Sequence, residues 1–378
     1  MFLFRWVFQL IFKPILLATG AVAAAMGLRR LLQQEADISG DVVVITGGSR
    51  GLGLQLAREF AAHGCRLVIC ARDEAELRRA EKELARAGGN GAAPELLAII
   101  CDVGDREQVE AMMAQARDRF GQIDILVNNA GIIDVAPLAS QPIEAFEQAM
   151  DTMYWGVVYA TFAVLPEMRA RRRGRIVNIT SIGGKASVPH LLPYNSAKFA
   201  ATGFSEGLRA ELAGSGVIVT TIIPGLMRTG SFLHAYFRGQ QQKEYGWFSL
   251  ASSLPLLTMS AQAAARQIVE ATRRGEAERT LSLPAQILAR LTGLFPGLIA
   301  DANGLANRLM PEPSGTERER GYRVQQEMEL RQRRLLRQLA ALGWEGAYQL
   351  NELAPEERKE VQTDSKKEGG QRIPVPGT

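Results

Sequence analysis

The sequence of 378 residues is poor in the side chains that bind metals or form disulfide bonds. It contains three cysteines and three histidines, and none of them shares a metal-ligand spacing with another ligand. We therefore expect no metal site and no disulfide framework. Cys70 and Cys101 lie in apolar runs, which is typical of small buried side chains in a reducing compartment.

The chain also lacks a strong charge of either sign. Its formal net charge is +4, and no basic run is interleaved with aromatic residues. We therefore expect no nucleic-acid partner. A hydrophobic content of 47% is enough for a sizeable buried core, and the length allows one large domain or two.

The N-terminus carries a long apolar run. Residues 1–28 contain only two charged side chains, Arg5 and Lys13. The stretch from Trp6 to Leu28 is long enough to cross a hydrocarbon core about 30 Å thick. We predict a membrane segment over residues 1–36. Lys13 and Pro14 leave two arrangements open, a spanning helix or a kinked helix lying in the interface.

Two other interpretations of this run are weaker. The small residues Ala23–Ala25 are typical of a signal-peptide cleavage site, and a buried first helix of the fold is the plain alternative. If the segment spans, Arg29 and Arg30 place the following domain on the cytoplasmic side. The sequence thus favours a membrane-associated protein whose main domain faces the cytoplasm.

From residue 37 the pattern changes to short apolar runs alternating with helical segments. Strands are expected at 41–45, 66–71, 96–101, 123–127, 175–180 and 217–223, with helices between them. This alternation predicts an α/β fold with a Rossmann-like, doubly wound parallel sheet. Ligands of such sheets bind at the carboxyl ends of the strands.

We divide the rest of the chain by composition. The single core domain is expected over 37–285, an amphipathic extension over 286–311, and a charged tail over 312–378. The extension predicts a membrane contact, a lid or a dimer surface, with packing on its own domain as the alternative. The tail predicts one helix over 317–342 and disorder over 355–378, and no chemistry is expected in it.

A glycine-rich turn follows the first strand. Gly47, Gly51 and Gly53 separate that strand from its helix. Glycines at this place allow a tight turn, and they let backbone N–H groups approach a pyrophosphate at the helix N-terminus. The sequence therefore predicts a dinucleotide site.

The end of the second strand predicts which dinucleotide binds. A ribose 2′-hydroxyl is recognised by a carboxylate at this place, but Ala71 stands here, followed by Arg72, and Arg50 adds a cation in the glycine turn. Two guanidinium groups favour a 2′-phosphate, so we predict NADP(H) rather than NAD(H). Two alternatives stay open: Arg72 only leads into the next helix, or Asp73 reaches the ribose.

Tyr194 and Lys198 form the candidate catalytic pair. They lie four residues apart and share one face of a helix. A nearby ammonium lowers the pKa of a tyrosine, which suits it for proton transfer at cellular pH. Ser181 follows the strand at 175–180, where its hydroxyl is placed to hold a carbonyl oxygen beside Tyr194.

Together these motifs resemble the short-chain dehydrogenase/reductase family over roughly residues 38–285. The resemblance implies that Ser181 orients a carbonyl, that Tyr194 is the general acid, and that Lys198 holds the nicotinamide ribose and lowers the pKa of Tyr194. It also implies a homodimer or homotetramer. The cofactor-binding residues that we expect are Gly47, Ser49, Arg50, Gly51, Leu52, Gly53, Arg72, Asp102, Val103, Asn129, Ala130, Gly131, Tyr194, Lys198, Pro224, Gly225 and Thr229.

One position departs from the family pattern. Where the family usually has an asparagine in the helix after Asn128, this chain has Met153. In the family that asparagine helps to hold a water that links the lysine to solvent. A thioether cannot donate a hydrogen bond and accepts only weakly, so proton resupply is slower, is arranged through another group, or fails.

We predict an NADPH-dependent oxidoreductase that interconverts a ketone or aldehyde and an alcohol. The membrane segment and the aromatic loop at 230–258 favour an apolar or lipid-like substrate, the loop forming a pocket wall or a face toward lipid. Packing of that loop on its own domain is the alternative. Met153 favours a second function, a non-catalytic NADP(H)-binding scaffold or sensor.

Overall fold

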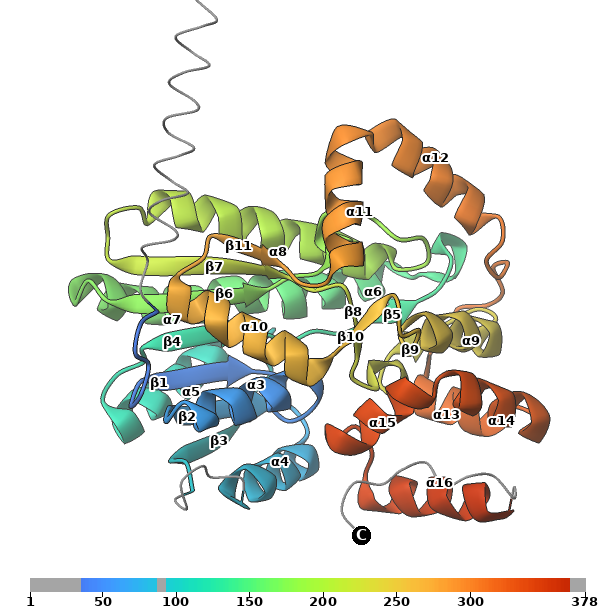
Figure 1. The fold of residues 1–378 in the computed structure, drawn as a ribbon, viewed down its shortest axis with the longest axis horizontal. Coiled ribbons are helices and arrows are strands. Elements are labelled where there is room, and N and C mark those ends of the chain that lie inside the picture. Colours follow the sequence, from blue (N-terminus) through green and yellow to red (C-terminus); the bar gives the residue numbers. More distant parts are fainter. Residues whose placement is uncertain (1–34, 87–92, 368–378) are drawn as a thin grey trace, which may run out of the picture. The chain divides into compact units, whose positions relative to one another are not determined.

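The computed structural model describes residues 35–86 and 93–367 (Figure 1). By its internal contacts the chain divides into two units, Met1–Asp37 and Ile38–Thr378, and the second is described below. The predicted membrane segment, residues 1–36, lies outside the described residues except for its last two.

A seven-stranded sheet forms the centre of the fold, and all its neighbouring strands are parallel. Its order is β11-β7-β6-β4-β1-β2-β3. This confirms the predicted Rossmann-like sheet. The strands are β1 (Val42–Thr46), β2 (Arg66–Ala71), β3 (Leu96–Ile100), β4 (Ile125–Asn128), β6 (Gly174–Ile179), β7 (Val217–Ile223) and β11 (Glu278–Thr280).

Helices cover both faces of this sheet (Figure 1). The helices α3 (Gly51–Ala62), α4 (Glu74–Arg86) and α10 (Ala261–Arg274) pack on one face. The helices α5 (Arg106–Phe120), α7 (Gly156–Ala170) and α8 (Leu192–Glu211) pack on the other. Because both faces are covered, the central strands are apolar on both sides, and Val42–Ile45 are fully buried.

Side-chain caps fix where several helices begin. Asp105 accepts hydrogen bonds from the backbone N–H groups of Glu107 and Gln108 at 2.9 and 3.2 Å. Ser260 caps α10 in the same way. These caps satisfy donors that have no partner within the helix.

A π-helical turn interrupts the helical stretch between β5 (Asp134–Val135) and β6. The helix α6 (Ile143–Met150) passes into the π-helical turn Asp151–Trp155 and then into α7. Met153 lies in this turn and is fully buried. Turns of this kind in a helix are frequent at functional sites.

The segment after β7 forms small elements of its own. They are β8 (Leu226–Arg228), β9 (Tyr236–Phe237), α9 (Gln241–Ala251) and β10 (Thr258–Ser260), and β9 also pairs with β5 (Asp134–Val135). Phe232, Phe237 and Tyr245 are buried in a core that they share with Trp344. The expectation of an aromatic pocket wall or lipid face is therefore wrong for these three, and the alternative of packing holds.

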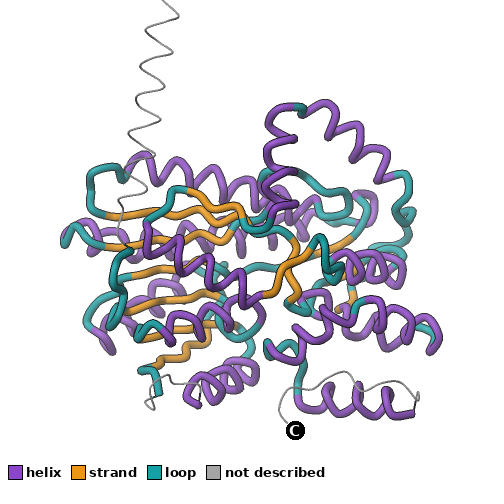
Figure 2. Tube along the Cα trace, in the orientation of Figure 1, coloured by secondary structure: helices purple, strands orange, loops and turns teal. Residues whose placement is uncertain are grey.

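The C-terminal part is more folded than expected. The predicted single helix over 317–342 is wrong, because the chain there forms β12 (Glu319–Arg320), α13 (Gly321–Glu327), α14 (Leu330–Leu339) and α15 (Ala341–Gln349). Burying Val324, Met328 and Trp344 in the shared core requires these breaks. Disorder from residue 355 is also wrong up to residue 367, where α16 (Pro355–Lys367) ends (Figure 2).

Between the core and this tail, two helices project from the fold (Figure 1). They are α11 (Leu283–Leu294) and α12 (Pro296–Asn307), and α12 buries none of its residues. Among the described helices, none is both long and apolar enough to cross a membrane by itself. Taken together, α11 and α12 have sufficient length and apolar composition, but the chain bends by 117° between them.

Candidate active site

The three catalytic candidates come from two neighbouring elements. Ser181 stands two residues after β6, and its Oγ accepts a hydrogen bond from the Gly183 backbone N–H at 3.0 Å. Tyr194 and Lys198 lie on one face of α8, with Lys198 Nζ 5.9 Å from the centroid of the Tyr194 ring. Lys198 Nζ also donates to the Ile179 carbonyl oxygen at 2.8 Å. The helix and the strand end thus converge on one point.

All of the expected catalytic and cofactor-binding residues line one cavity of about 570 Å³. It runs from the glycine turn after β1, past the ends of β2, β3 and β4, to Ser181, Tyr194 and the segment at 224–229. This is the carboxyl edge of the parallel sheet, where such folds bind their ligands.

Burial sets the protonation states of the catalytic pair. Burial lowers the pKa of Lys198 to about 8 and raises the pKa of Tyr194, against a smaller lowering by the Ser181 hydroxyl. In this structure burial outweighs the lowering of the Tyr194 pKa that was expected, and the net direction is upward. A protonated tyrosine remains suited to donate a proton to a carbonyl oxygen.

The glycine turn is tied to the end of β4. The Thr46 Oγ1 accepts hydrogen bonds from the backbone N–H groups of Asn129 and Ala130 at 2.9 and 3.1 Å, and Asn129 Nδ2 donates to the carbonyl oxygens of Thr46 and Gly47. A Cβ on Gly53 would lie 2.0 Å from the Gly47 carbonyl oxygen. Only glycine fits there, because the turn folds back onto its own helix.

The residues of this turn fit a pyrophosphate. Helix α3 begins without a side-chain cap from Arg50, and the first N–H groups of a helix have no partner within it. The backbone amides of Leu52 and Gly53 at the cavity are therefore suited to accept an anion, which the helix dipole also favours.

Comparisons with known proteins agree with this geometry. Residues 41–236 match the family model described as short chain dehydrogenase. The chain belongs to the short-chain dehydrogenase family. Members of this family are oxidoreductases that act on CH–OH groups with nicotinamide cofactors.

Three relatives show how far the similarity extends. A dehydrogenase/reductase SDR family protein 7-like from Anopheles gambiae is 35% identical over 62% of this chain and 73% of the relative. The 11-beta-hydroxysteroid dehydrogenase A of Sesamum indicum is 36% identical over 64% and 68%. A crystal structure of a variant actinorhodin polyketide ketoreductase with NADPH superposes with a TM-score of 0.55 at 28% identity, covering 66% of this chain and 97% of that one.

Met153 occupies the position of the family's asparagine, beside the catalytic lysine. The same glycine, Gly131, faces both of them, since a Cβ on it would lie 3.5 Å from Met153 Sδ and 4.0 Å from Lys198 Nζ. The Met153 sulfur therefore lies near the Lys198 ammonium group. It offers no donor for a bound water.

At the expected adenosine end of the cavity, Arg50 is bonded to carboxyl groups of the protein, although it was expected to bind a phosphate. Its Nη1 lies 2.6 and 2.7 Å from the two carboxylate oxygens of Glu76, and its Nε lies 3.4 Å from Glu352 Oε2. Arg72 is half exposed, and its nearest carboxylate oxygen, on Asp102, is 3.6 Å away. Of the two expected guanidinium groups, Arg72 has the longer ion pair and remains suited to a phosphate, whereas Glu76 already balances the charge of Arg50.

Asp73 has another task. Its Oδ1 accepts the Glu76 backbone N–H at 2.8 Å and so caps α4. The Asp73 carboxylate is therefore already engaged in capping α4, which disfavours the alternative that it binds a ribose.

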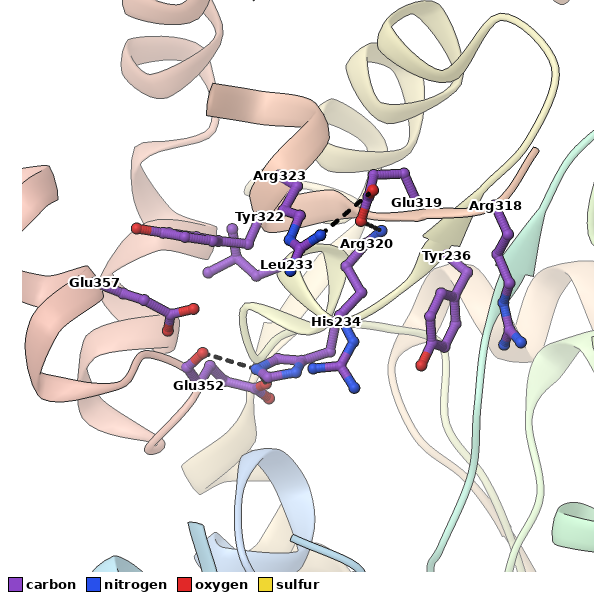
Figure 3. Close-up of a pocket in the computed structure, with 10 residues that line it drawn as sticks. All are labelled: Leu233, His234, Tyr236, Arg318, Glu319, Arg320, Tyr322, Arg323, Glu352 and Glu357. Carbon is purple, nitrogen blue, oxygen red and sulfur yellow. Dashed lines mark hydrogen bonds and ion pairs between the residues drawn. The ribbon is translucent and has the colours of Figure 1, made fainter. Parts of the chain in front are cut away.

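Sequence reasoning missed the part of the cavity that is built by the C-terminal tail. Arg320 and Glu352 line the cavity, together with His234 and Tyr236 of the segment after β8. Figure 3 shows His234 with its Nε2 directed at Glu352, and the two are joined at 2.7 Å through the Glu352 carbonyl oxygen. The tail, in which no chemistry was expected, therefore contributes two residues to the wall of the site.

Glu352 is a buried carboxyl group in the wall of this site. Burial raises its pKa to about 8, against the lowering effect of Arg50. Since the folded pKa is above the unfolded value of 4.5, the folded state holds a proton that the unfolded state releases between these values. The resulting stability is fully present below pH 4.5 and is lost as the pH rises to about 8.

We predict that Glu352→Gln removes this pH dependence. The difference in unfolding free energy between wild type and variant should change by at most about 5 kcal/mol across that window and then stay constant. Denaturant unfolding at a series of pH values measures it. Glu356→Gln is the control, because Glu356 is exposed on the same segment. Parallel curves for wild type and Glu352→Gln would contradict the prediction.

Proposed function

We propose that this protein is an NADPH-dependent reductase that converts a ketone or aldehyde to an alcohol, or catalyses the reverse reaction. The observation that carries the proposal is the convergence of Ser181, Tyr194 and Lys198 on the cavity that also contains the glycine turn. Met153 favours the alternative of a non-catalytic NADP(H)-binding scaffold or sensor.

The chain's own residues supply the proton chemistry. The bound nicotinamide would supply the hydride. The Ser181 hydroxyl is placed to hold the substrate oxygen, and Tyr194 donates a proton to that oxygen as it gains negative charge. Lys198, buried beneath Tyr194, is cationic below its pKa of about 8 and stabilises the tyrosinate left after proton transfer.

Two observations support NADP(H) over NAD(H). The end of β2 presents Arg72 to the cavity, and the carboxylate directly after it, on Asp73, caps a helix. The related ketoreductase was crystallised with NADPH. A guanidinium at this place favours a 2′-phosphate.

Replacing Tyr194 by Phe tests the mechanism. Loss of the general acid should lower kcat/KM by about 100-fold or more, while the dissociation constant for NADPH changes little. Steady-state NADPH oxidation and cofactor titration measure the two quantities. Tyr159→Phe is the matched control, since Tyr159 stacks on Trp155 away from the cavity.

The outcomes separate the two functions. If wild type and Tyr194→Phe turn over at the same rate, the catalytic assignment fails. If wild type binds NADPH and oxidises none across a broad carbonyl panel, the scaffold is the better account.

We also propose that the substrate is apolar or lipid-like and that the protein lies on a membrane. The apolar run at residues 1–28 supports this, and so does the exposed hairpin of α11 and α12. Asn303 on α12 donates to the Ser187 carbonyl oxygen at 2.9 Å, which places the hairpin beside the segment that follows Ser181. Its exposed apolar side chains are Leu283, Ile287, Leu291, Leu294, Phe295, Leu298, Leu305 and Leu309.

Vesicle binding tests the contribution of the hairpin. A chain without residues 1–34 keeps the compact unit Ile38–Thr378 and should co-sediment with vesicles of phosphatidylcholine and phosphatidylserine. The combined substitutions Leu294→Ser, Phe295→Ser and Leu298→Ser should lower the bound fraction several-fold, because exposed apolar side chains drive interfacial binding.

The control removes exposed leucines elsewhere. Leu330, Leu335 and Leu339 on α14 are similarly exposed, and replacing them by Ser should leave the bound fraction unchanged. Equal effects of the two sets, or no binding by the parent chain, would contradict a membrane-facing hairpin.

A further inference from the structure

The C-terminal tail is built into the wall of the cofactor cavity. The Leu350 carbonyl oxygen accepts the Gly51 backbone N–H at 2.9 Å. Asn351 Nδ2 donates to the carbonyl oxygens of Ser49 and Glu76 at 2.9 and 3.1 Å. A segment 300 residues downstream therefore holds the glycine turn and the start of α4 together.

Because the tail docks here, Arg50 lies next to carboxyl groups and is poorly placed to bind a phosphate. Glu76 and Glu352 both contact its guanidinium, and both carboxyl groups are largely buried. Glu76, which contacts Arg50 through both carboxylate oxygens, already balances the arginine charge, so Arg50 has little net charge to offer an incoming phosphate. A 2′-phosphate carries a charge of about −1.5 to −2, so a second cation besides Arg72 would stabilise it.

The tail supplies that second cation. Strand β12 pairs antiparallel with β9, with Arg320 opposite Tyr236, and the Gly321 N–H donates to the Ala235 carbonyl oxygen at 2.9 Å. Backbone pairing thus fixes Arg320 beside Tyr236 at the cavity. In the view of Figure 3, the Arg320 guanidinium lies between the side chains of His234 and Tyr236.

The Arg320 guanidinium carbon lies 5.8 Å from the centroid of the Tyr236 ring, and Arg320 and Arg72 both line the cavity. Burial lowers the pKa of Arg320, but a hydrogen bond with Tyr236 and the charges of Glu76 and Asp73 raise it overall. Likewise, burial raises the pKa of Tyr236, while Arg320, Arg318 and Arg72 lower it overall. Arg320 and Arg72 therefore act on the same region of the cavity from opposite elements.

We propose that Arg320 is a cofactor-binding residue that determines specificity, and that it holds the adenosine 2′-phosphate of NADP(H) together with Arg72. Arg50, by contrast, positions Glu76 and Glu352 and so anchors the tail. This inference rests on the proposed function, because it assigns the charge recognition of the same dinucleotide site. It makes the C-terminal tail part of the cofactor site.

The test compares two nucleotides on the full chain. For Arg320→Gln, the dissociation constant for NADPH should rise about 10- to 100-fold, the usual effect of losing a hydrogen bond to a charged group, whereas that for NADH should change less than about threefold. Titration by cofactor fluorescence measures both. Arg331→Gln is the matched control, since Arg331 is exposed on α14 and lines neither this cavity nor the pocket of Figure 3.

A second variant and a second measurement guard against a folding defect. Arg320→Lys keeps the charge but loses the planar fork, so its NADPH affinity should lie between wild type and Arg320→Gln. The salt dependence of NADPH binding should also be weaker in Arg320→Gln.

Three results would overturn the inference. Unchanged NADPH affinity in Arg320→Gln and Arg320→Lys would show that Arg320 does not touch the 2′-phosphate. Equal weakening of NADPH and NADH would assign it to another part of the cofactor or to the fold. If wild type binds neither nucleotide, the proposed function fails together with the inference; the first two results leave that function standing.

Discussion

The hold on the glycine turn is the constraint on which the rest of the structure depends. From inside, Thr46 and Asn129 tie the turn to the end of β4. The C-terminal tail holds the turn from the other side. The Leu350 carbonyl oxygen accepts the Gly51 N–H, Asn351 donates to the Ser49 carbonyl oxygen, and Glu352 contacts Arg50. The two sets of contacts fix the one loop that joins β1 to α3. They therefore also fix the place where a pyrophosphate meets the helix N-terminus and where the adenosine end begins.

The catalytic end is governed by burial rather than by a network of charges. Burial lowers the pKa of Lys198 and raises that of Tyr194, so the pair favours a neutral tyrosine above a readily deprotonated lysine. The neighbouring Met153 is fully buried and gives no donor for a proton relay. Tyr194 and Lys198 therefore account for delivery of the proton to the substrate, whereas Met153 does not contribute to its resupply.

Local patterns predicted much of the fold and the inner site. Alternating apolar runs, the capping residue Asp105 and the i, i+4 spacing of Tyr194 and Lys198 act over a few residues, so they are readable in sequence. The position of the tail could not be predicted from the sequence, because Arg320 reaches the cavity through strand pairing with Tyr236, which is far away in sequence. Its mixed charges favoured one exposed helix. A signal was present in Gly343 and Gly346: a Cβ on either would lie 2.3–2.4 Å from a neighbouring segment, which indicates close packing.

The most direct test of the account is NADPH oxidation by the full chain in detergent, offered long-chain ketones, sterol ketones and short polar carbonyls. The account predicts that NADPH is consumed, and faster with the apolar carbonyls than with the short polar ones. Binding of NADPH without consumption by any carbonyl would contradict the reductase assignment, and a preference for short polar carbonyls would contradict the apolar substrate.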